Sequence, residues 1–173
     1  MSTRRLVIGL GNPGDDYTLT RHNIGFMVTE TMAERAGLTW KFHSRSQADV
    51  ATSPELVIAK PQTYMNKSGQ SVRAVLDYFT LEPSAVTVVM DDVDLPFGEL
   101  RVRPGGGAGG HHGLEDIIAH LGTDQIRRIR FGIGRGPGTT TDHVLGRFTP
   151  DEQAMLPTLI DQAAVAAEKD VDE

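Results

Sequence analysis

The chain has 173 residues, of which 39% are hydrophobic and 23% charged, a composition typical of a globular domain and not of a disordered or fibrous protein. It contains no cysteine, which excludes disulfides, thiol catalysis and thiolate metal sites, and no apolar run approaches the roughly 20 residues of a membrane-spanning helix. The formal net charge of −6 argues against a tight, sequence-independent nucleic-acid binder but permits a local anion site.

The hydrophobic pattern predicts strands that alternate with helices along the chain. Continuous apolar or β-branched runs indicate strands at residues 6–10, 40–43, 48–51, 56–59, 86–90, 99–103 and 129–133. Apolar residues at helical spacing indicate helices at residues 23–36, 68–79 and 113–121. A last helix begins after a capping box at Thr149, and Pro157 is expected to kink or interrupt it. This order predicts one α/β domain over residues 1–173 with a mostly parallel sheet.

The charges are unevenly distributed. Residues 149–173 hold seven acidic residues against Lys169, whereas residues 101–135 hold six arginines against three acidic residues. A local excess of positive charge can attract an anion even when the net charge is unfavourable. Residues 1–5 lead directly into the first predicted strand, so we expect no cleaved signal peptide, and a cytoplasmic protein fits these observations.

A glycine-rich turn follows the first predicted strand. Residues 9–14 match the spacing GxGxxG, which in dinucleotide-binding proteins brings backbone N–H groups to a pyrophosphate at the start of a helix. Here Pro13 removes one of those donors, and Asp15 and Asp16 follow where a helix would begin. We therefore favour a tight turn that presents the Asn12 amide to a crevice, with a dinucleotide site as the weaker alternative.

His22 and a group of acidic residues are candidates for acid–base chemistry. His22 lies between a polar loop and a predicted helix, and an imidazole near neutral pH can accept a proton from water. Asp91, Asp92 and Asp94 follow a buried strand, at the end of the sheet where open α/β proteins bind ligands. One of these carboxylates could orient His22. A solvated turn or a divalent-metal site is the alternative, although further ligands at close spacing are lacking.

Two further motifs precede predicted helices. Residues 60–69 contain Asn66, which could simply cap a helix. Residues 105–110 hold five glycines and are followed by His111 and His112; such a loop lets a ligand approach the backbone, and the helix behind it can receive a phosphate. A metal bound by the two histidines is disfavoured because neighbours along a chain usually point apart. With no serine nucleophile motif, these groups favour water attack on an activated ester in a metal-free hydrolase.

These motifs resemble those of the bacterial peptidyl-tRNA hydrolase family. The resemblance rests on residues 9–14, Tyr17, residues 20–23, 64–69, 91–96 and 109–114, in the family's order, and covers residues 6 to about 148. It implies a monomeric, single-domain three-layer sandwich around a mixed, mostly parallel twisted sheet, with no metal or cofactor and no membrane partner. It also implies an enzyme that recycles tRNA by cleaving peptidyl-tRNA at its ester bond.

The resemblance also assigns residues to roles. His22 would activate water and Asp91 would hold its ring, while Asn12 and Asn66 would bind near the scissile carbonyl and stabilise the oxyanion. Tyr17 and Met65 would shape the pocket, and His111 would contact the substrate. The position of His112 would supply a hydrogen bond near the attacking water. The tRNA phosphates would be bound by Arg101, Arg103 and Arg130. The placement implied for His111 is the rim of the crevice.

Two departures from the family pattern bear on this assignment. His112 stands where the family usually has asparagine, and it is larger and titrates. The chain ends at Glu173, before the C-terminal residues that relatives usually carry, so a shortened C-terminus is expected. Because of His112, an RNA-binding protein on the same scaffold is a rival to the enzyme, and a nucleotide-dependent oxidoreductase is the second rival.

Overall fold

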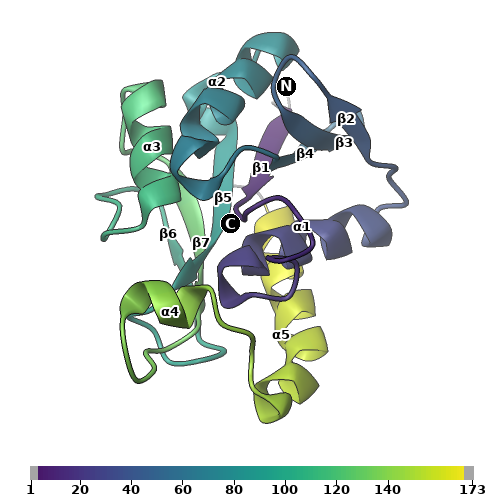
Figure 1. Ribbon diagram of the computed structural model, residues 1–173. Helices are drawn as coiled ribbons and strands as arrows, with labels where there is room; N and C mark the ends of the chain where they lie inside the picture. Colours follow the sequence, from purple (N-terminus) through teal and green to yellow (C-terminus); the bar gives the residue numbers. More distant parts are fainter. Residues whose placement is uncertain (1–3, 170–173) are drawn as a thin grey trace.

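The computed structural model describes residues 4–169, so the expectations about residues 1–3 and about the end at Glu173 lie outside the described part. One sheet contains the strands β1 (Arg5–Gly9), β2 (Lys41–His43), β3 (Ala48–Thr52), β4 (Leu56–Pro61), β5 (Val86–Asp92), β6 (Leu100–Arg103) and β7 (Arg127–Gly132). The helices are α1 (Ile24–Arg35), α2 (Ser68–Phe79), α3 (His112–Leu121), α4 (Thr140–Val144) and α5 (Pro150–Glu168), with short 3₁₀ turns η1 (Arg21–Asn23), η2 (Met65–Lys67) and η3 (Pro83–Ala85) (Figure 1).

The sheet is mixed, as predicted. Its strand order is β2-β3-β4-β1-β5-β7-β6. The four central strands, β4, β1, β5 and β7, run parallel, whereas β2 and β3 on one side and β6 on the other are antiparallel to their neighbours. The carboxyl ends of the parallel strands therefore meet at a single edge of the sheet, where ligands bind in open α/β folds.

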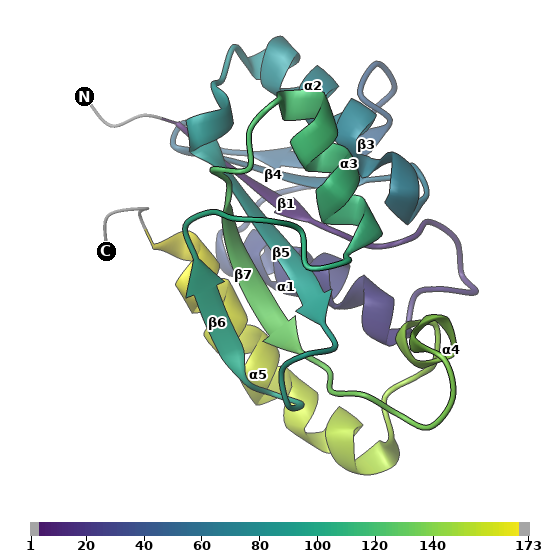
Figure 2. The ribbon, with the colours of Figure 1, turned by 90° about the vertical axis from the view of Figure 1, so that its left-hand side faces the viewer.

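Helices cover both faces of the sheet and complete the predicted three layers. On one face, α2 and α3 pack on alternate residues of β1, β4 and β5 around Leu6, Ile8 and Val88. On the other face, α1 and α5 pack around Val7, Val89 and Phe131 (Figure 2). Within residues 4–169, none of the helices is both long enough and apolar enough to traverse a lipid bilayer.

Apart from small shifts at the ends of other elements, three elements differ from the sequence expectation. Strand β5 reaches Asp92 because Asp91 and Asp92 pair with Phe131 and Gly132 of β7. Helix α4 was not expected, since its five residues carry no apolar periodicity. Helix α5 does not end or break at Pro157, and the prediction of an interruption was wrong. Pro157 is exposed, so water can satisfy the carbonyl that loses its helical donor.

Helix α1 approaches the sheet closely because two glycines face each other. A Cβ atom on Gly9 of β1 would lie 2.4 Å from the carbonyl oxygen of Gly25 in α1. A Cβ atom on Gly25 would lie 2.4 Å from the Val89 carbonyl oxygen and 2.5 Å from the Leu10 amide. This contact sets the height of α1 above β1 and β5, and with it the position of His22, which directly precedes the helix.

We expect Gly25→Ala to lower the free energy of unfolding by about 1–3 kcal/mol, because the added methyl group would push α1 off the backbone of β1 and β5. The higher helix propensity of alanine offsets only about 1 kcal/mol. Urea unfolding followed by circular dichroism measures the change. Gly107→Ala is the control, since no atom lies within 4 Å of its added Cβ; equal stability of the two variants would contradict the close-contact explanation.

Candidate active site

A cavity of about 620 Å³ opens where the loops after β1, β4 and β5 meet α4 and the start of α3. Nine of the residues predicted to form the site line it: Asn12, His22, Met65, Asn66, Asp91, Arg103, His111, His112 and Arg130. Tyr17 and Arg101 do not line it. Tyr17 lies in the turn before η1, where its carbonyl accepts the Thr20 amide at 3.0 Å, and its expected role in shaping the pocket stays a prediction.

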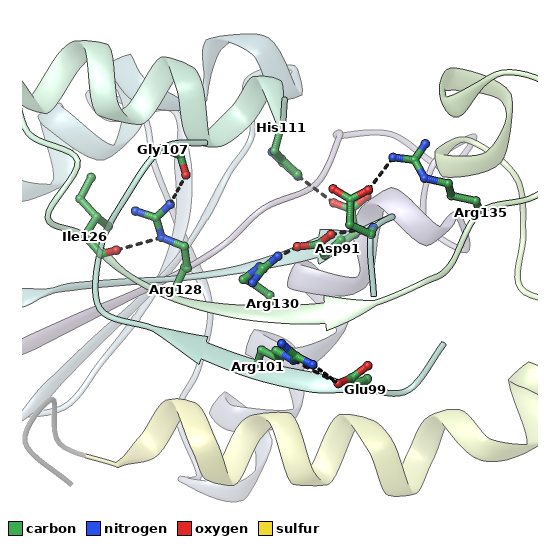
Figure 3. A network of polar contacts seen from close by, with 11 residues as sticks. Asp91, Glu99, Arg101, Gly107, His111, Ile126, Arg128, Arg130 and Arg135 are labelled. Carbon is green, nitrogen blue, oxygen red and sulfur yellow. Dashed lines mark hydrogen bonds and ion pairs between the residues drawn. The ribbon is translucent and has the colours of Figure 1, made fainter. Parts of the chain in front are cut away.

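Asp91 lies at the centre of the polar groups and is 3% exposed. One carboxylate oxygen, Oδ2, is 2.8 Å from Nδ1 of His22. The other, Oδ1, is 2.8 Å from Nε2 of His111, a contact that Figure 3 shows. His22 is brought to Asp91 by η1, His111 by the start of α3, and Asp91 by β5. Three segments far apart in the sequence thus supply one hydrogen-bonded group.

These contacts define the protonation of both rings. An ionised carboxylate only accepts hydrogen bonds, so His22 donates from Nδ1 and His111 donates from Nε2. Nδ1 of His111 accepts the Leu114 amide at 3.3 Å, so both ring nitrogens of His111 are occupied. In neutral His22, Nε2 is left unprotonated, and it has no hydrogen-bond partner among residues 4–169.

His111 lines the cavity, so its expected contact with the substrate stays a prediction. The side chain does not project from the rim, however. The His111 side chain is instead 8% exposed, and it holds Asp91 from the side opposite His22. Any direct contact with a ligand would use carbon atoms of the ring, because both nitrogens already have partners.

Burial and the two histidines act in opposite directions on the Asp91 carboxyl. Burial alone would raise its pKa, but the charges of His22 and His111, together with their hydrogen bonds, outweigh burial and hold the pKa of Asp91 well below its usual range. Asp91 is therefore a carboxylate at any pH near neutrality, and its role as acceptor for both rings is permanent.

This depressed pKa predicts an acid-sensitive contribution to stability. A carboxyl whose pKa is lower in the folded state stabilises the fold above its unfolded pKa, about 4, and this contribution is lost as the pH falls through the folded value. We expect the difference in unfolding free energy between wild type and Asp91→Asn to shrink by about 1 kcal/mol between about pH 5 and pH 3. Urea titrations at both pH values measure it; a constant difference would contradict the depressed pKa.

Asn12 is held by a residue that the sequence analysis did not identify. Asn23, 2% exposed, accepts the Asn12 amide through Oδ1 at 2.9 Å and donates from Nδ2 to the Asn12 carbonyl at 3.0 Å. The Asn12 side chain accepts the Met65 amide through Oδ1 at 2.8 Å. Its Nδ2 group has no partner among the described residues, and Asn12 lines the cavity. Exposed Asn66 lines the same cavity, and within residues 4–169 no hydrogen bond holds its side chain.

Four arginines form a block on the uncovered edge of the sheet, on the side of α3. Antiparallel pairing places Arg101 opposite Arg130 and Arg103 opposite Arg128, so all four share one face. Figure 3 shows Arg101, Arg128 and Arg130. Arg101 pairs with Glu99 and is 59% exposed outside the cavity. Arg130 pairs through Nε with Asp92 at 2.6 Å. Arg103 has no ion-pair partner within residues 4–169.

The structure also bears on the two alternative ligands, a dinucleotide and a metal ion. No helix begins at Gly14, and residues 15–19 form turns, so the arrangement that binds a dinucleotide pyrophosphate is missing there. Ligand atoms of His22, Asp91 and His111 lie within 4.8 Å of one another, close enough to surround a metal ion. Their nitrogens that face Asp91 are at hydrogen-bond distance and carry protons, which a metal would have to displace.

The chain is similar to known proteins both in sequence and in structure. The family model described as Peptidyl-tRNA hydrolase matches residues 6–173. The peptidyl-tRNA hydrolase of Mycobacterium tuberculosis (strain H37Rv) is 47% identical over 97% of this chain and 91% of its own length. That of Chloroflexus aurantiacus is 49% identical over 94% of this chain and 90% of its own length.

A solved structure is similar over almost the whole chain. The crystal structure of peptidyl-tRNA hydrolase from Acinetobacter baumannii superposes with a TM-score of 0.89 at 36% sequence identity. The match covers 97% of this chain and 88% of that one.

Proposed function

The chain belongs to the peptidyl-tRNA hydrolase family, and we propose that it hydrolyses the ester between peptide and tRNA by water attack assisted by His22 and Asp91. The hydrolase activity on peptidyl-tRNA follows from the family. The division of labour among the residues is inferred from their geometry. One observation carries it: Asp91 occupies Nδ1 of His22 at 2.8 Å and leaves Nε2 free in the cavity.

In the proposed reaction, Nε2 of His22 takes a proton from water as the water oxygen attacks the carbonyl carbon of the ester. Asp91 stabilises the imidazolium that forms, as the carboxylate does in a base–orienter pair. The tetrahedral intermediate then collapses, the bond between the carbonyl carbon and the ribose oxygen breaks, and His22 returns the proton to that oxygen. Free peptide and deacylated tRNA leave, and no covalent enzyme intermediate forms.

We assign the oxyanion contact to the Nδ2 group of Asn12. Its carboxamide is fixed in place because Oδ1 accepts the Met65 amide and Asn23 clamps its backbone. An orientated donor of this kind stabilises charge that develops on the carbonyl oxygen. Asn66 supplies a second donor from η2, with Met65 forming the apolar wall beside it.

We assign the tRNA to the arginine-rich side of the cavity. Arg103 and Arg130 both line it, and Arg101 continues the positive surface along β6. Phosphate contacts of this kind give affinity that falls with salt and carries no sequence information. Because the substrate arises in translation, we propose that the enzyme is cytoplasmic. We also propose, from the family resemblance, that it is a monomer and works without metal or cofactor.

A single-turnover assay on N-acetyl-aminoacyl-tRNA separates the enzyme from the RNA-binding rival. The enzyme releases labelled N-acetyl-amino acid and deacylated tRNA in equal amounts, with EDTA present throughout. A binding protein shifts the tRNA in a native gel and releases nothing, and that result would overturn the proposal. Saturable binding of NAD or NADP would favour the oxidoreductase instead.

His112 is examined in the same assay. It is exposed, begins α3 and lines the cavity, so its ring lies within reach of a bound substrate. Comparing wild type with His112→Asn over a range of pH measures what the histidine contributes. A pH profile that changes shape between the two proteins would assign part of the titration to His112.

A further inference from the structure

Arg128 is the largest side chain among the fully buried ones, at 1% exposed, and it carries a charge. It lies on β7 between Arg127 and Ile129 and reaches the floor of the cavity. No carboxylate of residues 4–169 lies within ion-pair distance of it. Burying a cation without a counter-ion costs folding free energy unless hydrogen bonds compensate for the lost water. The hydrogen-bond partners of Arg128 therefore indicate what holds it in place.

Each of its three guanidinium nitrogens donates to a backbone carbonyl. Nε donates to Ile126 at 3.1 Å and Nη1 to Gly107 at 2.7 Å (Figure 3), and Nη2 donates to Asp124 at 3.0 Å. Two of these carbonyls belong to the turn before β7, and the third belongs to the glycine-rich loop, residues 105–110. Arg128 thus connects the sheet to a loop 21 residues earlier in the chain.

The glycine-rich loop has few means of holding its own conformation. Gly106, Gly109 and Gly110 have φ values of +118°, +62° and +84°, a region that glycine enters freely and that therefore costs much entropy to fix. Ala108 carries its only side chain beyond hydrogen. One backbone bond, from the Gly106 amide to the Asp124 carbonyl at 3.0 Å, is the other tie to the turn before β7.

The loop leads directly to the group around Asp91. The His111 amide donates to the Ala108 carbonyl at 3.1 Å, one residue after the carbonyl that Arg128 holds. His111 then caps α3 and donates from Nε2 to Asp91. The position of Gly107 therefore influences, through a single turn, where His111 lies relative to the Asp91 carboxylate.

The neighbouring arginines differ from Arg128 in which of their guanidinium donors have no partner. Arg130, two residues along β7, donates from Nε to Asp92, and its two Nη groups have no hydrogen-bond partner within residues 4–169. Arg103 has no ion-pair partner within the described part of the chain. A phosphate can therefore be bound by Arg103 and Arg130, whereas each nitrogen of the buried Arg128 guanidinium already donates to a backbone carbonyl.

We propose that Arg128 is a positioning residue: it ties the glycine-rich loop to β7, fixes His111 against Asp91, and is not one of the phosphate ligands. This rests on the proposed function only in its kinetic consequence. The structural part, an anchored loop, is independent of what the site hydrolyses.

The test compares Arg128→Lys with Arg130→Lys and Arg130→Met on the same strand. Lysine keeps the charge but lacks the planar set of donors that reaches three carbonyls at once. We expect Arg128→Lys to lower kcat by about 10- to 100-fold, as small misplacements of reacting groups do. The affinity for deacylated tRNA and its dependence on KCl should stay as in wild type. Arg130→Met should weaken binding and reduce the salt dependence by about one phosphate contact.

Two results would overturn the proposal. The first is a wild-type kcat in Arg128→Lys, which would mean that charge alone suffices. The second is a reduction in salt dependence equal to that of Arg130→Met, which would make Arg128 a phosphate ligand. If wild type itself releases no peptide, the proposed function fails, and the loop is then judged by hydrogen exchange alone.

Hydrogen exchange distinguishes positioning from a general loss of stability. In Arg128→Lys, the amides of residues 106–111 should exchange faster while those of β1 and β5 keep their protection. Faster exchange everywhere, or no change in the loop, would contradict the anchoring role. Should Arg128→Lys not fold, the arginine Nε–H resonances of wild type decide. Titration with inorganic phosphate should leave that of Arg128 in place, and a shift that saturates together with those of Arg103 and Arg130 would overturn the proposal.

Discussion

Replacing His22 with alanine is expected to lower kcat for release of N-acetyl-amino acid from its tRNA by at least about 10²- to 10⁴-fold, the range that a positioned general base contributes. Nε2 of His22 is the ring nitrogen that stays free in the cavity, since Asp91 occupies Nδ1. Neither nitrogen of His111 can replace it, because one donates to Asp91 and the other accepts from Leu114. Water would then attack without a base at the required place.

Affinity for deacylated tRNA should change little in His22→Ala, because the arginines that we assign to phosphate are on β6 and β7. His120→Ala is the matched control: this histidine is 40% exposed on α3 and does not line the cavity. Single-turnover peptide release and tRNA binding are measured on both variants, with circular dichroism to verify the fold. Near wild-type release by His22→Ala would show that another group is the base.

The main architecture and three of the site segments could be predicted from the sequence for a physical reason. Continuous apolar runs identified the central strands, and parallel strands bring their carboxyl ends to one edge. Asn12, His22 and Asp91 each follow or adjoin such an end, so their convergence is a consequence of topology. The predicted helix at residues 68–79 coincides with α2, where the apolar spacing is regular.

The remaining parts of the site depend on contacts between segments far apart in the chain, which periodicity does not reveal. Asn23 sits in a motif already singled out, yet its bonds to the Asn12 backbone appear only once α1 is packed against β1. Arg128 was counted as part of a basic segment, because charged residues are almost never fully buried. Arg128 is nevertheless buried, because its guanidinium donates to three backbone carbonyls. Strand β7 accordingly begins at Arg127, two residues before the predicted start.

A motif alone did not predict how the side chains of Arg101 and His111 lie relative to the cavity. Arg101 and Arg103 are both on β6 and share a face, but only Arg103 lines the cavity, whereas the Arg101 side chain pairs with Glu99. His111 follows the glycine loop, as expected for a rim residue. Its cap on α3 turns the ring inward to Asp91 instead.

Asp91→Asn is expected to reduce kcat by up to about 10⁴-fold, the effect seen when an orienting carboxylate in a base–orienter pair is made an amide. The carboxylate accepts from both His22 and His111, whereas an asparagine side chain accepts through only one of its two heavy atoms. His111 is already committed as a donor toward Asp91, because its Nδ1 accepts the Leu114 amide. The amide oxygen would therefore face His111, and the amide N–H₂ group would face His22.

That arrangement forces His22 into the wrong tautomer. With an N–H₂ donor opposite Nδ1, this nitrogen must become an acceptor, and the proton moves to Nε2, which can then no longer take a proton from water. Binding of deacylated tRNA should persist, and kcat should fall while KM stays within a few-fold of wild type. Asp94→Asn is the control, since this exposed carboxylate pairs with Arg135 at the cavity's outer edge.

NMR of the histidine rings links the rate to the tautomer. In wild type, ¹⁵N shifts of neutral His22 should report a proton on Nδ1, and in Asp91→Asn a proton on Nε2. A large loss of kcat with His22 still protonated at Nδ1 would mean that Asp91 acts by its charge on the imidazolium and not by fixing the tautomer. Unchanged kcat would remove Asp91 from the mechanism, and His22 would then need an orienting partner that the hydrogen bonds of residues 4–169 do not supply.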